Sequence, residues 1–173
     1  MTVSIPDSVP AEGNVKAVFV PGGLADRNAP TVAEVAAGVD ISCFLMPDWD
    51  GPTATQNTGE QRRFCSKQSF GVLGRVSWTI APLVYTYLPQ GTDSDPANVV
   101  YVELAEGVTG DLLMFFGIEP EEVVTATDKA DVFPVECGVQ DKDSRGADEF
   151  APLTVTQTLG VKGPRVPDVA VVA

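Results

Sequence analysis

The sequence predicts a mainly β fold: an antiparallel β-sandwich or barrel with one or two short helices, a long loop and extended terminal arms. Two observations support this fold class. Six or seven segments are either rich in β-branched residues or alternate between polar and apolar residues, and only two segments carry helix signals. The 173 residues and the hydrophobic fraction of 44% suit one folded domain over residues 1–173.

The N-terminal third contains the clearest local signals. Residues 15–20 are rich in valine and end at a Pro-Gly-Gly turn, which predicts the first strand; the polar segment 1–14 before it is expected to be an arm. Thr31 and Glu34 have capping-box spacing, so residues 31–38 are expected to form a helix with Gly38 in a left-handed conformation at its end. Residues 39–45 alternate and predict a half-buried strand.

The remaining segments follow the same rules. Residues 47–69 are polar and predict a long loop or an extended hairpin, whereas 74–88 is expected to be the longest strand, interrupted at Pro82. Asp95 followed by Pro96 predicts the start of a second short helix. Three further strands are predicted at 111–118, 129–139 and 152–163, and the Pro- and Val-rich segment 164–173 is expected to be a C-terminal arm.

Composition excludes several classes of function. The chain has 24 acidic and 11 basic residues, and a net charge of −13 argues against binding to a nucleic-acid backbone. No apolar run is long enough to span a membrane and no signal peptide is recognisable, so we expect a soluble protein made in the cytosol. The three cysteines are widely spaced, which favours free thiols.

The sequence lacks the usual components of an active site. It has no histidine, and therefore no common general base or triad partner, and its glycines match no nucleotide-binding motif. Carboxylate pairs such as Asp48 with Asp50, or Asp141 and Asp143 with Asp148, have no specific spacing. We therefore predict no catalytic residue, no metal and no cofactor. An enzyme or a carbohydrate-binding module is the alternative from another class.

Two stretches resemble a known family. Residues 29–42, APTVAEVAAGVDIS, resemble the P-T-x-A-E-hydrophobic-x-A-G-x-D stretch that follows the first strand in the major tail proteins of actinobacterial siphophages. Residues 132–138, VFPVECG, are similar to a late strand of the same family, and an acidic loop and the closing strand 153–157 follow them. Together these segments extend the resemblance over most of the chain.

The resemblance implies a tail tube subunit, a β-sandwich flanked by a helix that forms stacked hexameric rings. Its expected partners are other copies of itself, a tape-measure protein, and tail terminator and tail-tip proteins. DNA would pass through the lumen without specific binding, and the protein would be assembled in the host bacterial cytoplasm into the virion tail. The alternative within virion proteins is a tail terminator, head–tail joining or decoration protein.

Two sets of contact residues are predicted on this basis. Residues expected to contribute to ring stacking combine positive charge with an aromatic ring: Arg62, Arg63, Phe64 and Lys67. Polar positions on the outward side of predicted strands are expected to face the lumen or a neighbouring copy: Asp40, Ser42, Arg75, Ser77, Thr79, Thr154, Thr156 and Thr158.

Overall fold

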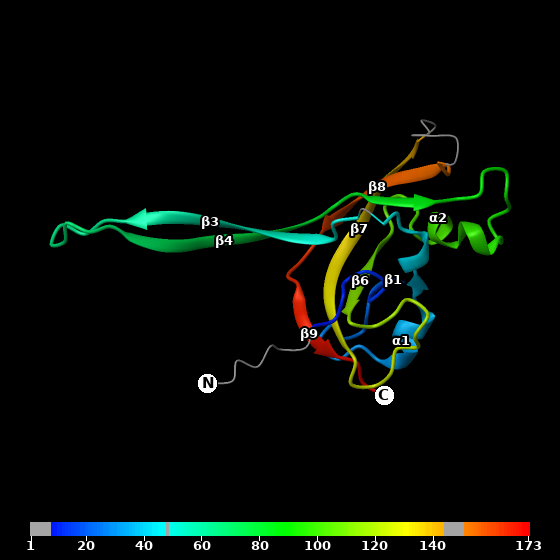
Figure 1. Cartoon of the computed structure of the whole chain (residues 1–173), viewed down its shortest axis with the longest axis horizontal. Coiled ribbons are helices and arrows are strands. Elements are labelled where there is room, and N and C mark those ends of the chain that lie inside the picture. Colours follow the sequence, from blue (N-terminus) through cyan, green and yellow to red (C-terminus); the bar gives the residue numbers. More distant parts are fainter. Residues whose placement is uncertain (1–7, 48, 144–150) are drawn as a thin grey trace.

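Two β-sheets of very different size make up the fold, as seen in the computed structural model, which describes residues 8–47, 49–143 and 151–173. A curled, half-barrel antiparallel sheet forms the body, and a two-stranded hairpin projects from it (Figure 1). The mainly β fold class predicted from the sequence is confirmed. Part of the predicted N-terminal arm, residues 1–7, and the candidate carboxylates Asp48 and Asp148 lie outside the described residues.

The large sheet has the strand order β2-β1-β6-β7-β8-β5, with β9 paired to β7. Its strands are β1 (Val15–Pro21), β2 (Val39–Asp40), β5 (Leu83–Thr86), β6 (Thr109–Phe116), β7 (Lys129–Asp143), β8 (Thr154–Val161) and β9 (Val166–Ala170). Strand β7 pairs with β6 through residues 130–136 and with β9 and β8 through successive parts of its length. The longest strand is therefore β7, whereas the predicted 74–88 strand is divided between two sheets.

The central strands are apolar on both sides because both faces of the large sheet are covered. In β1, Phe19 belongs to one buried cluster and Val18 to the other, and Leu112 and Leu113 of β6 divide in the same way. Helix α2 (Val99–Glu103), preceded by the 3₁₀ turn Pro96–Asn98, contributes Val100 to the first cluster. Helix α1 (Val32–Ala37) contributes Val35 to the second cluster.

Helix α1 begins as its capping box predicts but ends differently. Glu34 N–H donates to Thr31 Oγ1, and the Glu34 carboxylate accepts from Thr31 N–H at 2.9 Å. Gly38 has φ −72°, so its expected left-handed conformation is a wrong prediction. A Cβ at Gly38 would lie 2.8 Å from the Val18 side chain, so glycine is required here because the chain passes close to β1.

The predicted strand 39–45 is also wrong beyond Asp40. Residues Ser42–Phe44 form a 3₁₀ turn, because the Asp40 carboxylate accepts hydrogen bonds from both the backbone N–H and the hydroxyl of Ser42. The Ser42 hydroxyl in turn accepts from Ala17 N–H at 2.8 Å. This local network ends the ladder, and Cys43 becomes exposed rather than facing the core.

Two segments outside the predicted strands contribute strands to the structure. In the 47–69 segment, the extended-hairpin alternative is confirmed, because β3 (Pro52–Gln61) pairs with β4 (Phe70–Ile80). The C-terminal segment 164–173, predicted to be an extended arm, contains β9, and Val169 is buried against the body. Sequence composition could not indicate this pairing because the partner strand β7 lies more than 30 residues away.

Candidate assembly interface

The β3–β4 hairpin is the main exposed feature of the molecule. Antiparallel strands rise about 3.4 Å per residue, and the ten residues of β3 extend away from the body (Figure 1). All residues from Thr53 to Gln61 and from Phe70 to Ser77 are exposed. The exposed set includes large apolar side chains: Leu73 is 69% exposed, and Phe70, Val72 and Val76 are also on the surface. An isolated two-stranded hairpin is only marginally stable in water, so this arm is suited to being covered.

A β-bulge places Leu73 on the same side of the hairpin as the apolar residues near the body, whereas Val72 and Phe70 lie on the opposite side. Gln56 lies opposite Val76, but Thr58 lies opposite Leu73, so β4 has one more residue than β3 in this interval. Directly opposed residues share a face, and therefore Leu73 lies on the same side as Val76, Trp78 and Ile80 despite the three-residue spacing. The other side near the body carries Arg75, Ser77 and Thr79.

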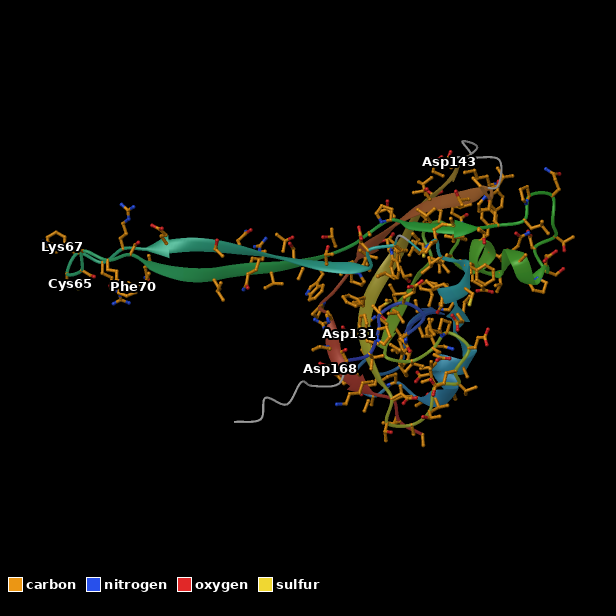
Figure 2. The ribbon with its side chains drawn as sticks, viewed as in Figure 1. Cys65, Lys67, Phe70, Asp131, Asp143 and Asp168 are labelled. Carbon is orange, nitrogen blue, oxygen red and sulfur yellow. The ribbon has the colours of Figure 1, made fainter. Side chains whose placement is uncertain are left out.

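The tip of the hairpin combines positive charge with a fully exposed aromatic ring. Arg62, Arg63 and Lys67 surround Phe64, whose exposed fraction is 111%. Arg62 lies 3.8 Å from the Glu60 carboxylate, but both side chains are largely exposed, so this ion pair contributes little. Figure 2 shows Cys65 and Lys67 at the far end of the arm, with Phe70 just behind them. The structure thus brings together all four predicted stacking residues.

The root of the hairpin is fastened to the body by aromatic and charged contacts. Trp78 packs edge-to-face on Phe133 of β7, with ring centroids 5.5 Å apart. The Arg165 guanidinium lies 4.6 Å from the Trp78 ring centroid and donates to the Asp131 carboxylate at 2.7 Å. The Trp49 indole N–H donates to the Ala81 carbonyl at 3.0 Å. These contacts fix the direction in which the arm leaves the sheet.

Comparison with known proteins identifies the family. A family model described as "Phage tail tube protein" matches residues 2–173. This chain belongs to the phage tail tube protein family. It is therefore a structural protein of the virion tail, although the sequence match does not distinguish the actinobacterial siphophage group. No curated protein matches the sequence.

A solved structure supports the fold of this tail tube protein. A chain in the six-fold symmetrised cryo-EM structure of the anti-feeding prophage (AFP) baseplate superposes with a TM-score of 0.51. The two chains are 13% identical, and the match covers 95% of this chain and 98% of the other. At this identity the likeness establishes the shared fold.

The predicted lumen or neighbour-facing residues occupy three places in this tail tube protein. Arg75, Ser77 and Thr79 lie on the polar side of the hairpin, and the three threonines of β8 point away from the buried Val155 and Leu159. Thr154 and Thr156 are half-buried and Thr158 is exposed. Asp40 and Ser42 are instead engaged inside the subunit: Asp40 pairs with Lys16 Nζ at 2.9 Å, and Ser42 bonds to Ala17.

Sequence reasoning missed a buried polar network beneath the first core cluster. The Gln157 amide is fully buried and donates to the Leu104 and Gly138 carbonyls at 2.7 and 2.8 Å. Its oxygen accepts from the Tyr85 hydroxyl at 3.1 Å, and Gln140 donates to the same hydroxyl. Burial raises the pKa of Tyr85 to about 12. The only signal in the sequence was that Gln157 occupies an inward position, between Val155 and Leu159, in a strand that has threonines at its outward positions.

No group of three or more metal-ligating side chains occurs in the part of the chain that is described. No helix in these residues is long and apolar enough to cross a membrane. The three cysteines are free thiols in the structure; Cys43 and Cys65 are exposed, and burial raises the pKa of Cys137 to about 11.

Proposed function

We propose that this protein is the tail tube subunit itself, which assembles into hexameric rings that stack into a hollow tube for genome DNA. The observation that carries the proposal is the projecting β3–β4 hairpin, with its exposed apolar side chains and its basic, aromatic tip. A surface of this kind is costly to leave in water, and a neighbouring copy can bury it. Membership of the tail tube family supports the same conclusion.

The charge of the chain suits a DNA conduit. A net charge of −13 per subunit would give an assembled channel an acidic character, and acidic walls do not retain phosphates. Screening over about 8 Å at physiological salt restricts this effect to groups that line the channel. We propose that the polar side chains Ser77, Thr79 and Thr158 contribute to the lumen or to contacts beside it.

The proposed role implies further partners. A tape-measure protein would occupy the lumen before DNA enters, and tail terminator and tail-tip proteins would bind the two ends of the tube. Assembly would take place in the host bacterial cytoplasm. Arg62, Arg63, Phe64 and Lys67 would contribute to stacking between rings, and we assign no catalytic role to the chain.

Electron microscopy of the purified full chain at high concentration tests the proposal. We expect long tubes with a central channel and six-fold symmetry in cross-section. Isolated rings that never stack would favour a terminator or head–tail joining protein instead. A globular particle that does not polymerise even with the other tail proteins present would contradict the proposal.

Truncation of the hairpin provides the matching mutation test. Replacement of residues 56–76 by a short Gly-Ser linker removes the exposed arm and leaves both the main sheet and the Trp78 contacts intact, because the strand residues in this range pair only with each other. We expect a folded monomer that no longer forms tubes, measured by circular dichroism, sedimentation and microscopy. Tubes of normal length from this variant would show that the arm has no part in assembly.

A further inference from the structure

We propose that the hairpin tip docks into one specific pocket on a second copy of this chain, the cavity between helix α1 and the acidic loop at residues 119–124. This inference rests on the proposed function and assigns the receiving surface for the stacking contact. The cavity has a volume of about 230 Å³ and is lined by apolar side chains of β1, α1 and the loop, among them Val18, Val35 and Val124. Four charged residues also line it: Lys16, Asp40, Glu121 and Glu122.

The rim of this pocket carries uncompensated negative charge. Lys16 pairs with Asp40, and its ammonium group also donates to the carbonyls of Pro120 and Glu122 at 2.7 and 2.8 Å. These bonds hold the loop in place while the side chains of Glu121 and Glu122 remain exposed. None of the ion pairs found among the described residues involves either glutamate. The pocket is therefore preformed, apolar at its base and acidic at its rim.

The hairpin tip has the opposite character. Phe64 is a fully exposed ring with Arg62, Arg63 and Lys67 beside it. Residues 52–80 contain four cations and one carboxylate and carry a charge of +3. Because the whole chain has a net charge of −13, the remaining residues carry −16. An aromatic side chain flanked by arginines matches an apolar pocket with an acidic rim, and this complementarity selects a second copy as the occupant.

Geometry prevents the tip from reaching the pocket of its own chain. The hairpin leaves one side of the body, whereas α1 lies on the other side (Figure 1), and the rigid contacts of Trp78 and Arg165 hold the arm in that direction. The two surfaces therefore meet only between copies, and such a heterologous contact can be repeated from one copy to the next.

Two other cavities on the body fit the tip less well. The hollow beside Tyr87 and Tyr101 is lined by Lys142 and Asp93, and the Lys142 ammonium group lies 4.9 Å from the Tyr101 ring centroid. The cavity at Leu24 and Pro164 is lined by Arg27 and Asp26. The charges that line each of these cavities therefore sum to zero, whereas Lys16, Asp40, Glu121 and Glu122 give the α1 pocket a charge of −2, which favours a basic tip.

Paired charge reversals test the contact. The tip-reversed variant carries Arg62→Glu and Arg63→Glu, and the pocket-reversed variant carries Glu121→Lys and Glu122→Lys. Each variant alone would juxtapose like charges, so the yield of tubes should fall at least about tenfold. When the two are mixed, every junction again joins opposite charges, and tubes should return. Asp93→Lys with Glu103→Lys, which reverses exposed carboxylates near α2, is the matched control and should leave assembly unchanged.

The possible outcomes separate this inference from the proposed function. If the unmodified chain forms tubes and the pocket-reversed variant forms them equally well, the assigned pocket is wrong and the tube function stands. If the unmodified chain forms no tubes, the tube function fails, but sedimentation of the mixed variants still reports the contact. Association of the mixture would support the docking, and its absence would overturn it.

A disulfide provides a second measurement that is independent of charge. In a Cys43→Ser background, Val123→Cys places a thiol on the exposed pocket rim, and Cys65 is the residue next to Phe64. Diamide oxidises two thiols to a disulfide and is itself reduced to the hydrazine. We expect crosslinked chains of several subunits on a non-reducing gel, and only monomers from a control with Cys65→Ser. Failure of the Val123→Cys variant to crosslink in intact tubes would refute the docking.

Discussion

At the residue scale, a few polar side chains join segments of this protein that lie far apart in the sequence. Lys16 joins β1 to the 119–124 loop and to Asp40, and Asp111 is fully buried yet accepts from Leu24 N–H and Arg27. Such groups are tolerated in the interior because each is hydrogen-bonded. They were not predictable from the sequence, because their partners lie 24 to more than 80 residues away.

Loss of the buried Gln157 side chain should destabilise the core. Gln157→Ala would remove the side-chain donor of the Gly138 carbonyl, would leave the Leu104 carbonyl with the 3.4 Å bond from Gln140, and would open a cavity next to Tyr85. We expect the free energy of unfolding to fall by about 1–3 kcal/mol, the cost of buried unsatisfied groups. Urea unfolding of the monomer measures this loss. Thr158→Ala, an exposed change on the same strand, should stay within about 0.5 kcal/mol of the parent.

Alkaline pH should destabilise the core through two buried groups. Burial raises the pKa of Cys137 from 9.0 to about 11 and that of Tyr85 from 10.0 to about 12. Because the folded pKa values are the higher ones, their contribution to stability is complete below pH 9 and is lost as pH rises through 9–12. The melting temperature should therefore fall over this range. Melting curves that remain unchanged up to pH 12 would contradict this assignment.

At the element scale, local signals were predictable and distant strand pairing was not. The capping box of Thr31 gave the start of α1, and Asp95-Pro96 gave the start of the 3₁₀ turn that precedes α2, because such starts depend on neighbours within three residues. The hairpin in 52–80 was one of the two alternatives that its polar sequence left open. The pairing of β9 with β7, in contrast, joins residues more than 30 positions apart. The β-bulge leaves a mark in the sequence, because Leu73 and Val76 are three residues apart whereas Val76 and Trp78 are two apart. Without knowledge of the pairing with β3, this spacing only indicates an interrupted alternation.

Glycine packing between strands gives a prediction at this scale. A Cβ at Gly110 of β6 would approach the Phe19 ring to 2.7 Å and would press on the Val20 carbonyl, so Gly110→Ala must separate β6 from β1. We expect a loss of about 1–3 kcal/mol from overpacking, measured by thermal unfolding. Gly59→Ala on the hairpin, with nothing within 4 Å of the new Cβ, is the control and should leave the melting temperature almost unchanged.

At the scale of the whole molecule, the projecting arm sets the shape of the free subunit. A compact chain of 173 residues would have a radius of gyration near 16 Å, and a ten-residue strand adds an arm of about 34 Å. X-ray scattering of the monomer should give a clearly larger radius and a tail at long distances. Removal of residues 56–76, which keeps Trp78 on the body, should restore the compact value. A compact profile for the full chain would indicate that the hairpin folds back onto the body.

The hairpin tip of the candidate interface was predictable from sequence, whereas the proposed receiving pocket was not. Arg62, Arg63, Phe64 and Lys67 lie within six consecutive residues, so their exposure together follows from a polar setting between two strand segments. The receiving pocket combines β1, α1 and a loop from the second half of the chain, and no local pattern unites them. Asp40 was chosen as an outward polar position, but its role inside the subunit depends on Lys16, which lies on another strand.

The one-sided position of the arm gives any stack built from this subunit a direction. The first and last layers are then chemically different: one presents unfilled pockets edged with carboxylates, and the other presents unbound, positively charged hairpin tips. Elongation could proceed from either layer only by recognition of that layer's own chemistry. A capping protein suited to one extremity would therefore be unable to seal the other, and tube length would be set by two distinct recognition events.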